Sequence, residues 1–108
     1  MEEATARPYG VTLRYFDGCP NWQGALDRLR QAIRDEGLVV EPVLERVDTQ
    51  EDAERLRFIG SPTILIDGRD PFGAPGASFG LSCRIFQTPE GLAGLPTKEQ
   101  LREALHSG

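Results

Sequence analysis

The sequence predicts a mixed α/β fold with the order β-α-β-α-β-β-α, in which helices cover both faces of a four-stranded mixed sheet. Runs of β-branched and aromatic residues alternate with segments whose apolar residues recur at helical spacing. The helical connection between the first two strands predicts a right-handed parallel crossover, and a hairpin between the last two strands makes one of them antiparallel. With 108 residues, the chain has room for one such domain.

Composition excludes several classes of function. Seventeen acidic against twelve basic residues give a formal net charge of −5, which argues against a nucleic-acid partner. No apolar run approaches the roughly 18 residues that span a bilayer, so we expect no membrane segment. Residues 1–8 lack the basic and apolar regions of a signal peptide, and a cytoplasmic location is the expectation. Gly73, Gly76 and Gly80 do not match a phosphate-binding loop, because no Gly-Lys-Ser/Thr sequence follows them. We expect no cofactor.

Residues 1–9 are predicted to form a loose arm, and residues 10–108 the domain. The run from Val11 to Phe16 is rich in β-branched and aromatic residues, which indicates the first strand. A turn ending at Pro20 precedes the first helix, because proline suits a first helical position. Its apolar face contains Trp22, Ala25, Leu26, Leu29, Ala32 and Ile33, and Gly37 is expected to end it.

Residues 38–47 form the second predicted strand. Pro42 favours an edge position for it, because proline has no N–H to donate to a neighbouring strand. Asp48 and Thr49 are candidate N-caps for a short second helix that ends near Gly60.

Residues 61–66 predict the third strand, which begins with a Ser-Pro pair and is closed by a turn at residues 67–68. The glycine- and proline-rich residues 69–81 are expected to form a long loop, and residues 83–87 the fourth strand. Residues 89–96 are expected to be a connection without regular structure. Thr97 and Gln100 have the spacing of a capping box, which predicts the start of the last helix.

Cys19 is the strongest candidate for chemistry. It lies where the first predicted strand ends and the first helix begins, the position at which α/β sheets place ligands. Free N–H groups and the macrodipole at a helix N-terminus favour an anion, and a thiolate is such an anion. Cys19 is therefore a candidate nucleophile, although a purely structural thiol is the alternative reading.

The element order, the Gly-Cys-Pro sequence at residues 18–20 and the Ser-Pro-Thr sequence at residues 61–63 resemble the thioredoxin-like superfamily. The resemblance covers about residues 10–106. It implies that Cys19 is the nucleophile and that the peptide bond before Pro62 is cis. It also implies that Ser61 offers backbone groups to an extended substrate, with Pro20 and Trp22 beside the thiol. The alternative interpretation of Trp22 is an aromatic residue in the core, or at its rim, on the first helix.

The chain departs from that family at the second cysteine of the Cys-x-x-Cys motif, where it has Trp22. This leaves a monothiol mechanism, resolved by an external thiol or by Cys83. If the fourth strand returns antiparallel to the third, Cys83 lies about four residues, or ~13 Å, from the Cys19 end. A disulfide needs Cα atoms within roughly 7 Å, so Cys83 is also open to interpretation as a small buried residue.

Three functional hypotheses follow. The first is thiol exchange with a small thiol or a protein disulfide, with Cys19 as nucleophile and Arg14 and Arg84 as electrostatic contributors. The second is a non-enzymatic binding module, or a soft-metal thiol binder in which Cys19 pairs with Cys83. A faint similarity of residues 79–84 to alkylmercury-lyase-like proteins of the thioredoxin fold suggests the metal. The third is a degenerate domain that dimerises through an exposed Trp22.

Overall fold

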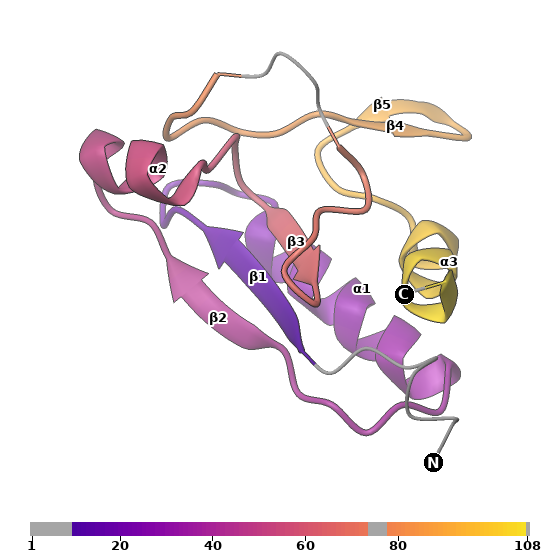
Figure 1. Cartoon of the computed structure of the whole chain (residues 1–108). Helices are drawn as coiled ribbons and strands as arrows, with labels where there is room; N and C mark the ends of the chain where they lie inside the picture. Colours follow the sequence, from indigo (N-terminus) through magenta and orange to yellow (C-terminus); the bar gives the residue numbers. More distant parts are fainter. Residues whose placement is uncertain (1–9, 74–77, 108) are drawn as a thin grey trace.

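The computed structural model describes residues 10–73 and 78–107, and the predicted arm at residues 1–9 lies outside this part of the chain. The fold is mixed α/β (Figure 1). The elements in order are β1 (Val11–Tyr15), α1 (Trp22–Asp35), β2 (Val43–Arg46), α2 (Gln50–Leu56), β3 (Thr63–Ile66), β4 (Phe86–Thr88), β5 (Gly91–Ala93) and α3 (Lys98–Ser107).

The main sheet has three strands in the order β2-β1-β3. β1 pairs parallel with β2, and Leu13 lies beside Leu44. β3 runs antiparallel to β1, with Leu13 beside Ile64. The predicted edge position of the second strand is confirmed, since Pro42 directly precedes β2 at the border of the sheet.

The expected four-stranded sheet is wrong. Residues 82–84 pair with β3 only through one isolated bridge, between Ser61 and Cys83, and this bridge is parallel. The chain then forms a separate hairpin, in which β4 pairs antiparallel with β5. The physical reason is the direction of return: the long connection brings the chain back to the start of β3 before it pairs, so it runs the same way as β3. Residues 74–77 of the predicted loop lie outside the described part.

Helices α1 and α3 pack together on one face of the sheet (Figure 1). Alternate residues of β1, Val11 and Leu13, are buried on this face, as the period-2 pattern predicts. The buried apolar residues of this core are Val11, Leu13, Ala25, Leu26, Leu29, Ala32, Ile33, Ile64, Ile66, Leu101 and Leu105. The predicted apolar face of the first helix is therefore the center of the core.

Helix α2 covers the end of the sheet at which β1 and β2 finish (Figure 1). It has a small core of its own, formed by Val47, Ala53 and Phe58. Thr49 is its N-cap and accepts a hydrogen bond from the N–H of Asp52 at 3.0 Å. This helix begins where the sequence predicts, because a capping side chain satisfies one of its free N–H groups.

Helix boundaries confirm two further local signals. Gly37 has φ +71° and follows the end of α1, a conformation that favours glycine. Thr97 and Gln100 form a reciprocal capping box, with backbone-to-side-chain hydrogen bonds of 3.0 and 3.1 Å.

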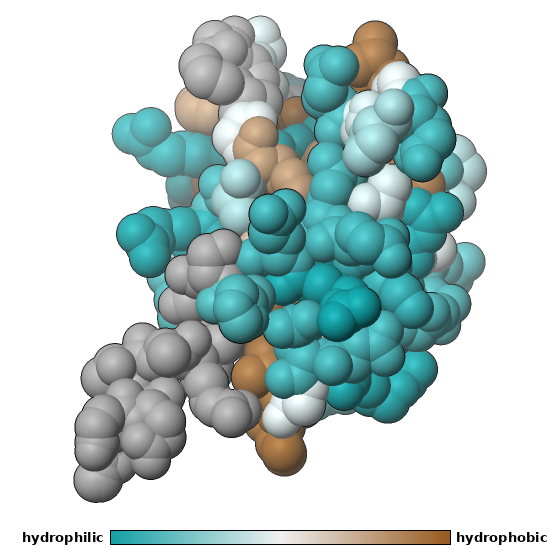
Figure 2. Space-filling model, turned by 90° about the vertical axis from the view of Figure 1, so that its right-hand side faces the viewer, coloured by the Kyte–Doolittle hydropathy of each residue, from teal (hydrophilic) through white to brown (hydrophobic). Residues whose placement is uncertain are grey.

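No helix in the described residues is long and apolar enough to cross a membrane. The molecular face on the side of α3 is largely hydrophilic (Figure 2).

Candidate functional site

The candidate site lies at the end of the sheet where β1 finishes, α1 begins and β3 starts (Figure 1). Three chain segments that are far apart in sequence meet there. They are the turn that contains Cys19, the Ser61–Pro62 pair before β3, and residues 82–84. The site therefore depends on tertiary packing, although each segment carries its own sequence signal.

Cys19 is held by the turn between β1 and α1. Its N–H donates to the carbonyl oxygen of Phe16 at 3.1 Å. Its Sγ donates to the carbonyl oxygen of Ser61 at 3.4 Å and accepts from the N–H of Asn21 at the same distance. The thiol is thus placed at the start of α1, as predicted, but Cys19 is only 3% exposed. A reagent cannot reach it from bulk solvent without passing its neighbours.

Ser61 links the two other segments. The Ser61–Pro62 peptide bond is cis, as the resemblance implies. The N–H of Ser61 donates to the carbonyl oxygen of Ser82 at 2.8 Å, and its carbonyl oxygen accepts from the N–H of Arg84 at 2.9 Å. Both backbone groups are therefore occupied by residues 82–84, and an incoming peptide could use them only if this segment left.

The Ser61 side chain adds an unusual polar group. Ser61 is fully buried, and its Oγ has no hydrogen-bond partner in the described part of the chain. A buried hydroxyl without a partner lowers the stability of the fold by about 1–3 kcal/mol. A purely structural role therefore does not explain the Ser61 hydroxyl. The backbone of Ser61 accepts a hydrogen bond from Cys19 and forms the bridge with Cys83.

Cys83 lies opposite Ser61, whose carbonyl oxygen accepts from Cys19, and this contradicts the expected separation of ~13 Å from the Cys19 end. The error came from the assumed antiparallel return; in the parallel bridge, Cys83 is directly opposite Ser61. Both thiols are free, and Cys83 is exposed, so its reading as a small buried residue is wrong as well. Desolvation of its sulfur raises the pKa of the Cys83 thiol, and the neighbouring Cys19 raises this pKa further.

The other predicted site residues do not gather into an open surface. Pro20 is exposed next to Cys19, whereas Pro62 is fully buried under the start of β3. Trp22 is half-buried and stacks on Tyr15, with ring centroids 4.0 Å apart. Trp22 thus packs against the main core, and the hypothesis of dimerisation through an exposed Trp22 loses its premise.

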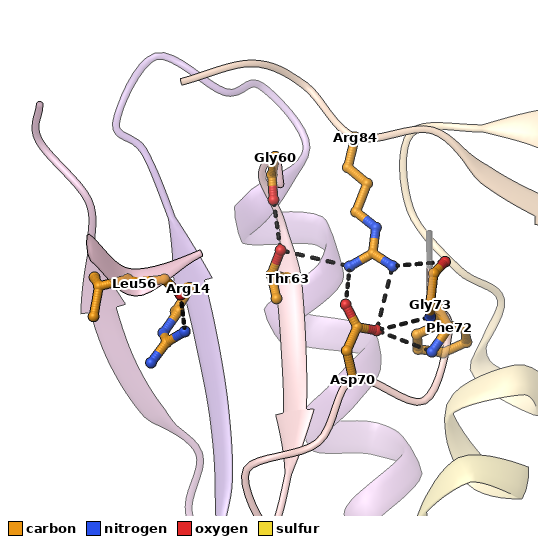
Figure 3. Close-up of polar contacts among 8 residues, drawn as sticks. All are labelled: Arg14, Leu56, Gly60, Thr63, Asp70, Phe72, Gly73 and Arg84. Carbon is orange, nitrogen blue, oxygen red and sulfur yellow. Dashed lines mark hydrogen bonds and ion pairs between the residues drawn. The ribbon is translucent and has the colours of Figure 1, made fainter. Parts of the chain in front are cut away.

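A buried ion pair supports the segment that carries Cys83 (Figure 3). The Arg84 guanidinium donates to both carboxylate oxygens of Asp70, at 2.7 and 3.2 Å. It also contacts Thr63 Oγ1 and the carbonyl oxygen of Gly73, and lies 4.7 Å from the Phe86 ring center. Sequence reasoning missed Asp70. The charge of Arg84 is neutralised by this partner, so Arg84 anchors the segment rather than attracting a thiolate.

Arg14 is also paired, on the sheet face opposite α1. It donates to Glu45 at 2.6 Å. It also donates to the carbonyl oxygen of Leu56 at 3.0 Å (Figure 3). Its contribution to the thiol site is therefore not supported.

A cavity of about 490 Å³ lies between the loop after β3 and α3, lined in part by Arg69, Phe72 and Gln100. Neither cysteine lines it, so this cavity is separate from the thiols.

The described residues contain no group of three or more His, Cys, Asp or Glu side chains that could hold a metal ion. No protein-family model, curated protein or solved structure matches the chain. What the arrangement can do chemically therefore follows from its geometry: two adjacent thiols, one buried and one exposed, can form one sulfur–sulfur bond or share one soft ion.

Proposed function

We propose that the protein is a thioredoxin-like thiol–disulfide exchange protein in which Cys19 and Cys83 act as a pair. The observation that carries the proposal is that one residue, Ser61, holds both cysteines: its carbonyl oxygen accepts from the Cys19 Sγ, and its backbone forms the bridge with Cys83. The strand order β2-β1-β3 and the position of Cys19 at the start of α1 support the resemblance. The separate β4–β5 hairpin departs from it.

Burial assigns different roles to the two thiols. A substrate disulfide meets Cys83 first, because Cys83 is exposed and Cys19 is not. Cys83, as thiolate, attacks one sulfur of the substrate, forms a mixed disulfide and expels the other sulfur as a thiolate, which takes up a proton. Cys19 then acts as the internal nucleophile on the Cys83 sulfur and expels the second substrate thiol. Two electrons and two protons reach the substrate, and the protein keeps a Cys19–Cys83 disulfide.

Asn21 favours the second step. Its N–H already points at the Cys19 sulfur, at 3.4 Å, and would stabilise the thiolate that attacks. The Ser61 carbonyl oxygen accepts from the same sulfur only while it is protonated. An external thiol, such as glutathione in a cytoplasmic setting, would reduce the disulfide and complete the cycle.

The test is to treat reduced protein with bis(2-hydroxyethyl) disulfide and to follow its mass. Wild type should lose two hydrogens and form a Cys19–Cys83 disulfide, which peptide mapping identifies. Cys19→Ala should stop at the mixed disulfide on Cys83, whereas Cys83→Ser should react far more slowly. If wild type accumulates only the mixed disulfide, as Cys19→Ala does, the pair does not act as proposed.

Soft-metal binding is the second candidate, favoured by the two cysteines that meet at Ser61. Two thiolates suit an ion that accepts two sulfur ligands, such as Hg²⁺ or Cu⁺. Titration of reduced protein with Hg²⁺ should then give one ion per chain, and either Cys19→Ala or Cys83→Ser should weaken binding by several orders of magnitude. Equal affinity in wild type and both variants would exclude a two-thiol site.

A further inference from the structure

The segment around Cys83 presents an apolar strip to solvent. Phe79, Leu81 and Ile85 are 37%, 37% and 63% exposed, and Cys83 lies among them at every second position. Arg84 and Phe86 are buried, so exposed and buried side chains alternate from Cys83 to Phe86, whereas Ser82 is exposed like its neighbours. The exposed thiol is thus flanked by apolar side chains on both sides along the chain.

The backbone of this segment has one free edge. In a parallel bridge, the residue opposite Ser61 turns its own N–H and C=O away, while its two neighbours make the hydrogen bonds. Ser82 and Arg84 make these bonds to Ser61, so the N–H and C=O of Cys83 face the other side. Neither group has a hydrogen-bond partner among residues 10–73 and 78–107.

We propose that this edge selects the substrate of the exchange reaction: an extended polypeptide segment with apolar residues beside its disulfide-bonded cysteine. This inference rests on the proposed function and names its substrate class. A peptide strand can pair with the free N–H and C=O of Cys83 and lay its alternate side chains against Leu81 and Ile85. A disulfide without a peptide backbone can react with Cys83 but can make none of these contacts.

The chemistry of the first step is the same for both substrate classes. The Cys83 thiolate attacks the peptide sulfur of a mixed disulfide between a peptide and thionitrobenzoate. A bond forms between Cys83 and the peptide sulfur, the old sulfur–sulfur bond breaks, and coloured thionitrobenzoate leaves. The rate of colour release therefore measures recognition of the group attached to the attacked sulfur.

The experiment compares three thionitrobenzoate mixed disulfides in reduced wild type and in Cys19→Ala, where only the first step occurs. They carry a five-residue peptide with valines on each side of the cysteine, the same peptide N-methylated at both residues adjacent to the cysteine, and 2-hydroxyethanethiol. The unmodified peptide should react at least tenfold faster than the other two, because two backbone hydrogen bonds and apolar contacts add about 1.4 kcal/mol or more.

Surface variants localise the effect. Leu81→Ser and Ile85→Ser should each slow the peptide reaction severalfold and leave the hydroxyethyl reaction unchanged. Val39→Ser is the matched control, because Val39 is a fully exposed apolar residue in the connection before β2. This control should change neither rate.

Equal rates for all three mixed disulfides would overturn this inference, and the proposed function would stand if the Cys19–Cys83 disulfide still formed. If the disulfide never forms but the peptide preference holds, the proposed function fails alone. A reduced protein that dimerises in gel filtration through this edge, with dimerisation lost in Ile85→Ser and no peptide preference, would assign the edge to a second copy instead and would overturn the substrate proposal.

Discussion

Replacement of Asp70 by asparagine tests how the segment carrying Cys83 is held. The Arg84 side chain is 4% exposed and its partner Asp70 20%. Asp70→Asn keeps the shape and an oxygen that can accept from the N–H groups of Phe72 and Gly73, as the carboxylate does now. It removes the negative charge, however, and leaves a guanidinium buried without a counter-ion (Figure 3).

The expected loss is about 3 kcal/mol of unfolding free energy, the lower part of the range for a broken buried pair. The lower part applies because Arg84 keeps weaker contacts with Thr63 and Gly73 and its place over the Phe86 ring. With a urea m value of about 1.5 kcal/mol per M, the midpoint should fall by about 2 M. Circular dichroism during urea denaturation measures this midpoint.

Asp48→Asn is the matched control. Asp48 pairs with Arg46 at 2.7 Å, but both side chains are more than half exposed. Such a pair contributes about 1 kcal/mol at most, because water and salt screen it. The double variant Arg84→Met with Asp70→Asn should regain part of the loss, since no unpaired charge remains. Equal midpoints for Asp70→Asn and Asp48→Asn would refute the view that a buried cation anchors this segment.

Three further changes have defined outcomes. Gly60→Ala should cost about 2 kcal/mol in urea denaturation, because Gly60 has φ +132° and its new Cβ would lie 3.1 Å from the Arg84 Cβ. Iodoacetamide should alkylate Cys83 with a pH midpoint above that of a free thiol, because the raised pKa keeps the thiol protonated to higher pH; Cys19→Ala should lower that midpoint, and an unchanged midpoint would contradict the influence of Cys19. Thr97→Ala should cost about 1 kcal/mol, seen as a lower melting temperature, because it removes half of the capping box.

The sequence predicted the features that neighbouring residues determine. The capping box at Thr97 and Gln100, the turn after β3 and the edge position of β2 each follow from a local rule of backbone chemistry. Strand β5 was not predicted, and residues 89–96 were expected to be an irregular connection. The reason is that Gly91-Leu92-Ala93 is short and contains few residues that favour strands. Its pairing with β4 is a property of the hairpin rather than of those three residues.

The candidate site was predicted only in part, for a different physical reason. Cys19 and the Ser61–Pro62 pair could be placed, because each follows or precedes a recognisable strand. The direction of residues 82–84 could not, because a long connection allows either return and composition does not distinguish them. In the same segment the charged Arg84 is buried while Cys83 and Ile85 are exposed, which hydropathy does not predict because it depends on the partner Asp70.

The position of the two cysteines couples the proposed redox state to the stability of the fold. A Cys19–Cys83 bond would close a loop of 65 residues and join the start of α1 to the segment paired with Ser61. Closing a loop of this length removes unfolded-state entropy worth about 4 kcal/mol at 25 °C. Oxidised protein should therefore have a higher urea midpoint than reduced protein, and Asp70→Asn, which loosens the Cys83 segment, should make the disulfide easier to reduce. If both redox forms unfold at the same midpoint, the two thiols are not joined in a native-like geometry.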